Sequence, residues 1–161
     1  MAQKALNLED IVAGNIIQTK GIGSMTWLKD GERYSRLENN KQTGGTDIVA
    51  YRAKDNSREV IIPSSLLTDK STGRPIPVRS VSWSADNEKV LIYNNTRRVW
   101  RYDTRGDYWV LNLKDGALRQ LGKGMPESSM MFAKFSPDGT RVAYVSNNNI
   151  YVEDIDSGKI T

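Results

Sequence analysis

The sequence predicts an all-β fold, a partial β-propeller of about three four-stranded antiparallel blades preceded by one short helix. Two observations predict it. Short runs rich in β-branched and aromatic residues alternate with Gly, Asn, Asp and Pro clusters along most of the chain. In addition, one type of segment recurs three times at a spacing typical of propeller blades.

The composition is that of a soluble globular chain. Of its 161 residues, 38% are hydrophobic and 26% are charged, which is enough for a packed core. No run approaches the roughly 18 consecutive apolar residues of a membrane span, so we expect none. The first residues lack the basic and then apolar pattern of a signal peptide, so any export signal has been removed or was never present.

The chain contains neither histidine nor cysteine. A Ser-His-Asp triad needs an imidazole to accept the serine proton, and zinc sites draw mainly on the same two residue types. We therefore expect no catalytic residue, no cofactor and no metal within this chain. Disulfides are excluded as well, and both a reducing and an oxidising compartment tolerate their absence.

The net charge of +4 arises from 23 basic residues set against 19 acidic ones over the whole length. The only dense basic run contains Arg97, Arg98, Arg101 and Arg105. Domains that bind nucleic acid usually concentrate their charge on one face and add stacking aromatic residues. We therefore expect no nucleic-acid partner.

The first predicted element is a short amphipathic helix over Leu6–Val12, with Asn7 as its N-cap. Residues 41–77 are interpreted only as strand and loop. The clearest strands are short alternating or β-branched runs, at residues 47–51, 90–93, 108–111, 141–145 and 150–152.

The recurring segment has an aromatic residue, then Ser or Leu, any residue, Asp, and Gly or Asn, followed by a strand. Its copies begin at Trp27, Trp83 and Phe135, roughly 50 residues apart. In the third copy Pro137 fixes φ for a turn, Asp138 can accept a bond from its own backbone, and Gly139 tolerates a positive φ. We expect each aromatic residue to be buried between neighbouring blades.

Further turn clusters at Asn147–Asn149 and Asp156–Gly158 complete most of a third blade. About three blades fit into residues 1–161, fewer than the four or more that close a ring. We therefore interpret residues 1–161 as one part of a propeller domain. An open end exposes an apolar blade face and a strand edge, so we expect the chain to self-associate, as a homodimer.

Three other patterns have a plainer explanation. Asp154–Gly158 resembles a calcium loop but lacks the later bidentate glutamate, so we expect a turn and no metal. Gly21–Ser24 and Thr43–Thr46 could be taken for phosphate cradles, but neither opens a helix after a strand. The four tryptophans could stack on sugars or bases, yet Trp27 and Trp83 head blade repeats and are better explained as core.

Residues 135–152, with their Ala-Tyr-Val, Asn-Asn and Ile-Tyr-Val stretches, closely resemble a segment of dipeptidyl peptidase IV and its prolyl oligopeptidase relatives, family S9. Two further matches follow in the same order. Leu6–Gly14 followed by Trp27-Leu28 resembles the opening helix and first strand of the family. Val99-Trp100-Arg101 precedes a strand that ends near Leu113, as in the family.

The resemblance implies a serine exopeptidase that releases X-Pro or X-Ala dipeptides from peptide N-termini. In that family the propeller caps an α/β-hydrolase domain, and this chain would form cavity wall and substrate gate without a catalytic residue of its own. By motif match, Arg101 is the arginine that binds a substrate backbone carbonyl. Tyr102-Asp103 stands where the family has His-Ser.

The glutamate pair that holds the substrate amino terminus, the Gly-x-Ser-x-Gly turn and the catalytic Asp and His do not occur within residues 1–161. The expected partners are therefore peptide substrates, the remaining blades and the hydrolase domain, in a periplasmic or secreted location. The alternative is a stand-alone propeller that serves as a scaffold for protein partners.

Overall fold

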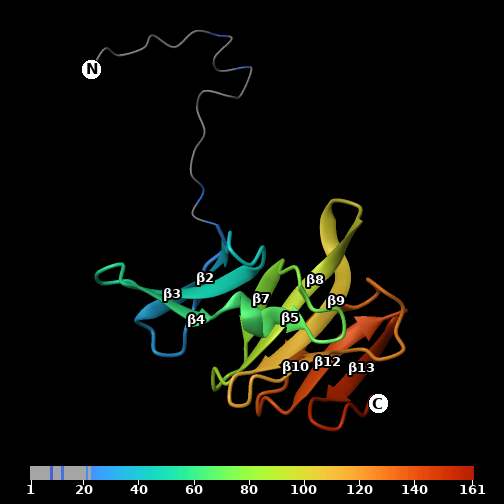
Figure 1. Ribbon diagram of the computed structural model, residues 1–161. Coiled ribbons are helices and arrows are strands. Elements are labelled where there is room, and N and C mark those ends of the chain that lie inside the picture. Colours follow the sequence, from blue (N-terminus) through green and yellow to red (C-terminus); the bar gives the residue numbers. More distant parts are fainter. Residues whose placement is uncertain (1–7, 9–11, 13–20, 22) are drawn as a thin grey trace, which may run out of the picture.

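The computed structural model describes Leu8, Val12, Gly21 and residues 23–161 (Figure 1). The helix predicted over residues 6–12 lies almost entirely outside the described residues, and that prediction is not confirmed. Within the described part, no helix is long and apolar enough to cross a membrane.

The described chain forms three larger antiparallel sheets, in which the strands follow one another in sequence order, and one small two-stranded sheet. Blade 1 contains β1 (Thr26–Trp27), β2 (Arg33–Asn39), β3 (Thr46–Arg52) and β4 (Arg58–Ile62). Blade 2 contains β7 (Ser80–Trp83), β8 (Lys89–Val99), β9 (Tyr102–Asn112) and β10 (Leu118–Gln120). Blade 3 contains β11 (Met131–Phe135), β12 (Arg141–Ser146) and β13 (Asn149–Asp154). Ile160 bridges to Glu153 at the place of a fourth strand, so the predicted all-β blade architecture is confirmed.

The connection between blades 1 and 2 lies mostly within residues 41–77, which the sequence analysis interprets only as strand and loop. It contains one 3-10 turn, η1 (Ser64–Leu67), and the small ladder of β5 (Thr68–Asp69) with β6 (Arg74–Pro75). Leu67 and Ile76 are buried, so this connection also contributes to the core. The five strands predicted most clearly from sequence all lie within β3, β8, β9, β12 and β13.

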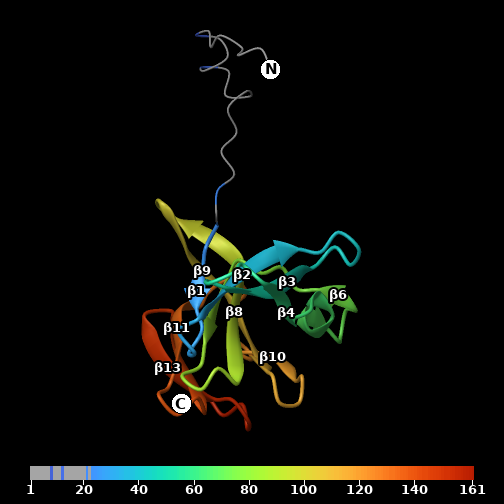
Figure 2. The same ribbon diagram turned by 90° about the vertical axis from the view of Figure 1, so that its left-hand side faces the viewer.

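Blade 2 is covered on both faces, because successive side chains of a strand point to opposite sides of the sheet. Val90 and Ile92 join a cluster that includes Ile48 and Ile62 of blade 1. Leu91, between them, joins the cluster on the other face, which includes Val142 and Tyr144 of blade 3. The continuous apolar run in β8 follows from this two-sided burial, and the blades stand side by side in both views (Figures 1 and 2).

The recurring segment forms the same tight turn in blades 2 and 3. The Ser136 hydroxyl donates to Asp138 at 2.5 Å and accepts from the Arg141 N–H at 3.0 Å, while Asp138 accepts from the Thr140 N–H at 3.0 Å. Gly139 has a φ of 67°, so the predicted need for a positive φ is confirmed. In blade 1, where Leu28 replaces the serine, Asp30 accepts from the backbone N–H groups of Glu32 and Arg33 instead.

The prediction that all three repeat aromatics are buried is wrong for Trp27, which is 61% exposed. Trp83 and Phe135 each pack toward the preceding blade; Trp83 donates to the Ser35 hydroxyl at 3.1 Å, and Phe135 packs against the cluster shared with blade 2. Trp27 stands at the same position of blade 1 and lies edge-on to Tyr34. No described residue forms a preceding blade that could cover it.

A buried carboxylate joins blade 3 to the connection that leads into it. Glu153 is 2% exposed and accepts hydrogen bonds from the Gly122 N–H at 2.8 Å and from the Tyr144 hydroxyl at 3.1 Å. Burial is the main reason why the pKa of Tyr144 is raised, so this hydroxyl remains a donor. Both donors depend on Glu153 for an acceptor in the described structure.

We predict that Glu153→Ala lowers the free energy of unfolding by about 2 to 4 kcal/mol, because it leaves two buried donors unpaired. The control is Glu59→Ala, which removes an ion pair to Arg33 whose carboxylate side is 65% exposed, and it should cost less than about 1 kcal/mol. Urea denaturation of both variants measures this difference, and equal losses would contradict it.

We also predict a pH dependence from Asp30. A hydrogen bond from the Arg33 side chain, helped by the N–H groups of Glu32 and Arg33, lowers the pKa of Asp30 from 3.8 to about 2. A lowered pKa in the folded state stabilises the fold above about pH 4, and this contribution disappears as the pH falls toward about 2. The melting-temperature difference between wild type and Asp30→Asn should therefore be largest near neutral pH and shrink over that range. A difference that stays constant with pH would contradict the prediction.

Candidate functional site

The β8–β9 hairpin is the longest in the described structure and projects beyond the sheet to which it belongs (Figure 1). Strand β7 pairs only with the Val90–Tyr93 part of β8, and beyond Tyr93 the hairpin pairs with another described segment only at the isolated Gly106–Met130 bridge. Its register is also irregular, with shifts between Asn94 and Arg97 and between Arg97 and Arg98. Side chains must therefore contribute to holding this half in place.

Two residues form the tip, where Trp100 and Arg101 connect the paired Val99 and Tyr102. Trp100 has a φ of 60° and is 93% exposed, and Tyr102 is 74% exposed. A positive φ is strained for a bulky residue, and such strain concentrates at ligand-binding positions. The turn therefore presents an aromatic ring and a guanidinium to solvent at the expense of local strain.

The hairpin carries an excess of positive charge. Arg97, Arg98, Arg101 and Arg105 are all exposed. Arg98 donates through Nε to the Trp100 carbonyl at 3.2 Å, so it supports the turn. Of the two acidic residues on the outer half of the hairpin, Asp107 is buried and Asp103 lies 3.5 Å from the Arg79 guanidinium. Among the described residues, the Arg101 side chain makes no hydrogen bond or ion pair.

At the base of this outer half, the side chain of Tyr93 extends from β8 across to β9. Its hydroxyl lies 2.9 Å from the Arg105 carbonyl and 3.1 Å from the Asp103 carbonyl, and its ring stacks on Tyr108 with centroids 4.9 Å apart. Burial, assisted by the neighbouring Tyr108 and Asp103, raises the pKa of Tyr93 to about 12, so the hydroxyl stays protonated and donates.

A second set of contacts ties the hairpin to the connection between blades 2 and 3. The buried Asp107 carboxylate accepts from the Ser128 N–H at 2.8 Å and from the Asn95 side chain at 2.7 Å. The same Asn95 amide donates to Glu127 at 2.7 Å, and the Ser128 hydroxyl donates to the Asn95 carbonyl at 2.6 Å. Asn95 has a φ of 43°, which allows its side chain to reach this network.

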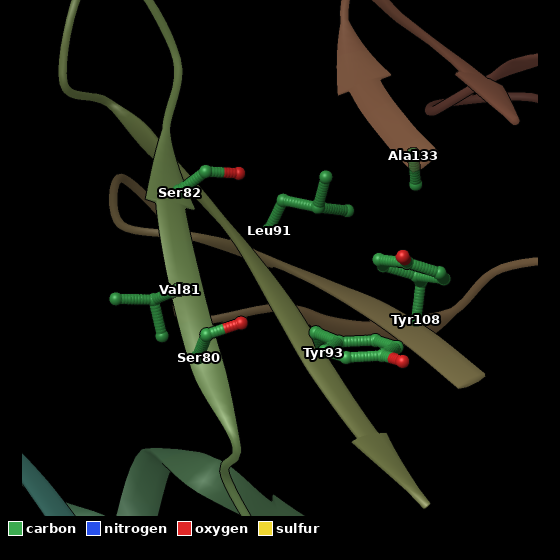
Figure 3. A pocket seen from close by; sticks show the side chains of 7 residues that line it. All are labelled: Ser80, Val81, Ser82, Leu91, Tyr93, Tyr108 and Ala133. Carbon is green, nitrogen blue, oxygen red and sulfur yellow. The ribbon is translucent and has the colours of Figure 1, made fainter. Parts of the chain in front are cut away.

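Beside the stacked tyrosines lies a small cavity of about 140 Å³ between the first strands of blades 2 and 3. Figure 3 shows Tyr93 and Tyr108 at one end of it, with Ser80 and Ser82 on β7 and Ala133 on β11. Its lining offers hydroxyl groups and apolar side chains but no charged group. The strongly polar chemistry of this region therefore belongs to the hairpin.

The chemistry available at the tip is recognition rather than catalysis. A guanidinium presents several permanently charged N–H donors and suits a carbonyl or carboxylate acceptor.

The turn at Asp154–Gly158, which resembles a calcium loop in sequence, uses its aspartate as a hydrogen-bond acceptor. Asp154 accepts from the Ser157 N–H at 2.8 Å and from the Ser157 hydroxyl at 2.6 Å. This arrangement confirms the predicted turn.

Arg101 lies at the tip of the hairpin, and its role in substrate binding stays a prediction. The residues at the base of the hairpin were not recognised from the sequence. Tyr93 and Gly106 lie inside strands and carry no motif. Asp107 could have been recognised from the sequence, because it precedes Asp115 by the same number of residues as Asp47 precedes Asp55. Asp47 indeed accepts from the Ser64 N–H at 2.7 Å in the connection between blades 1 and 2, as Asp107 does one blade later.

Comparison with known proteins gives consistent matches. The family profile described as Dipeptidyl peptidase IV (DPP IV) N-terminal region matches residues 84–161. The probable dipeptidyl-aminopeptidase B of Phaeosphaeria nodorum is 30% identical over 164 residues, which cover 98% of this chain and 18% of the relative. Dipeptidyl aminopeptidase B of Saccharomyces cerevisiae is 27% identical over 152 residues, 88% of this chain and 17% of the relative. The chain thus spans less than a fifth of the length of these relatives.

Among solved structures, dipeptidyl peptidase 4 of Porphyromonas gingivalis superimposes with a TM-score of 0.71 at 21% identity, over 100% of this chain and 22% of the other. TolB from Acinetobacter baumannii aligns with a TM-score of 0.50 at 16% identity, over 86% of this chain and 31% of the other. These likenesses concern the fold. Together with the family profile and the sequence relatives, they identify this chain as the N-terminal propeller region of a dipeptidyl peptidase IV-like protein.

Proposed function

We propose that this chain belongs to a serine exopeptidase that releases X-Pro and X-Ala dipeptides, and that it forms wall and gate of the substrate cavity. The observation that carries the proposal is the strained, exposed Trp100–Arg101 turn at the end of the β8–β9 hairpin. The turn lies in the segment that matches the N-terminal region of dipeptidyl peptidase IV. The names of the sequence relatives, dipeptidyl aminopeptidases, agree with this substrate class.

Arg101 is the substrate-binding residue of the proposal. Its guanidinium would donate to a backbone carbonyl of the bound peptide, a bond that gains strength where a neighbouring domain excludes water. Because this chain contains no histidine, the nucleophile and its base would come from an α/β-hydrolase domain outside residues 1–161. The proposal includes a periplasmic or secreted location and an inactive isolated chain.

The same proposal assigns a partner to the outer face of blade 3, which is the face turned away from blade 2. Leu91 and Tyr108 lie on the face of blade 2 that meets blade 3. Because the two blades form matching turns, Ala143 and Ile150 lie at the equivalent positions of blade 3, on its face away from blade 2. Ile150 is 75% exposed. We propose that another blade covers this face in the complete protein and that a second copy covers it in the isolated chain.

We predict that the isolated chain forms dimers that Ile150→Asp converts to monomers, because a charge on the shared face opposes its burial. Val60→Asp, an equally drastic change at an exposed position of blade 1, serves as the control and should leave the dimer intact. Light scattering after size exclusion measures the mass. A wild-type chain that stays monomeric at high concentration would contradict the prediction.

For the complete enzyme, we predict that Arg101→Ala lowers kcat/KM for an alanine-proline chromogenic substrate without changing the melting temperature. Loss of one charge-assisted hydrogen bond should cost about 1.5 to 3 kcal/mol, or about ten- to a hundredfold in kcat/KM. Arg97→Ala is the matched control, since Arg97 is an exposed arginine of the same hairpin. Equal kinetics of the two variants, or a defect of Arg101→Ala explained by unfolding, would overturn the proposed role.

A further inference from the structure

The direction of the Trp100–Arg101 turn depends on how the outer half of its hairpin is held. Beyond Tyr93, the β8–β9 ladder shifts register twice within a few residues. Beyond the Gly106–Met130 bridge this irregular ribbon pairs with no further described strand, and such a two-stranded ribbon twists and bends easily. Side chains that connect the two strands at the base therefore contribute to its direction.

Tyr93 makes this connection at the point where regular pairing ends. Its hydroxyl binds the carbonyls of Asp103 and Arg105, which follow the turn on the returning strand. These carbonyls lie two and four positions after Arg101 in the sequence, so the bond acts directly on the strand that leads out of the turn. The stack on Tyr108, with centroids 4.9 Å apart, fixes the orientation of the Tyr93 ring.

Gly106 leaves the room that this arrangement needs. A Cβ atom at Gly106 would overlap the Tyr93 ring and would lie 2.6 Å from the Asn94 carbonyl oxygen. Gly106 also exchanges backbone hydrogen bonds with Met130, in both directions, at 3.0 Å and 3.1 Å. The strand is therefore held by the chain entering blade 3, while the Tyr93 ring occupies the place that a Cβ atom of residue 106 would take.

We propose that Tyr93 is a positioning residue, which aims the Trp100–Arg101 turn by binding the returning strand of the hairpin, with Gly106 as the complementary gap. This inference rests on the proposed role of Arg101 in substrate binding. Tyr93 is not required to touch the substrate. Its contribution comes through the geometry of the turn.

The test uses the complete protein that contains this chain and the variant Tyr93→Phe, which keeps the ring and its stack but removes the hydroxyl. Tyr151→Phe in β13 is the matched control, since Tyr151 also stacks on a tyrosine, Tyr144, in blade 3. Hydrogen exchange of the segment 98–105 should accelerate about fivefold in Tyr93→Phe and not in Tyr151→Phe. Exchange of the segment 141–154 should remain unchanged in Tyr93→Phe.

Kinetics then separate positioning from a merely structural role. With an alanine-proline chromogenic substrate, Tyr93→Phe should lower kcat/KM about three- to tenfold in the wild-type background and leave it unchanged in an Arg101→Ala background. Such non-additivity shows that Tyr93 acts through Arg101. Gly106→Ala should lower kcat/KM at least as much as Tyr93→Phe, because its Cβ atom displaces the ring and also overlaps the Asn94 carbonyl oxygen.

Unchanged exchange in the hairpin of Tyr93→Phe would overturn the proposal, as would an equal kinetic loss in both backgrounds. If Arg101→Ala alone leaves kcat/KM unchanged, the proposed substrate role of Arg101 fails instead. The exchange data still decide in that case whether Tyr93 holds the hairpin.

Discussion

The packing of blade 2 between its two neighbours is the constraint on which the rest of the structure depends. Val90 and Ile92 face blade 1 while Leu91 faces blade 3, so a single strand contributes to both clusters of the core. Because blades contact mainly their neighbours, the position of each blade follows from the one before it. A change in β8 would therefore disturb both interfaces and also the hairpin that β8 enters.

Besides this apolar packing, buried carboxylates form hydrogen bonds to the segments that connect the blades. Asp47 and Asp107 each receive the backbone N–H of a serine in the connection to the next blade, and Glu153 receives that of Gly122. Carboxylates that accept backbone N–H groups satisfy donors which would otherwise be buried without partners. The connections between blades are thereby fixed, and with them the base of the β8–β9 hairpin.

Most of the fold could be predicted from sequence, because the information is local and repeated. The segment from Phe135 to Gly139 specifies its own turn through hydrogen bonds between near neighbours, and the structure contains that turn. The exposure of Trp27 could not be predicted, since it depends on which blade precedes it. Tyr93 and Gly106 could not be recognised either, because their contact is defined only once the two strands are paired in register.

From the sequence, the motif Val99-Trp100-Arg101 singles out one candidate residue, whose role stays a prediction, and it gives no information on the contacts that support the hairpin. The structure adds the positive φ of Trp100, the projection of the hairpin and the contacts beneath it. These features give Arg101 a defined setting at an exposed tip.

The most direct test of this account is a crystal structure of the complete protein with a dipeptide-based inhibitor bound. If Arg101 binds substrate as proposed, its guanidinium lies about 3 Å from a backbone carbonyl oxygen of the inhibitor, with the hairpin reaching into the cavity between propeller and hydrolase domain. An inhibitor bound without contact to Arg101, with the hairpin directed into solvent, would contradict it.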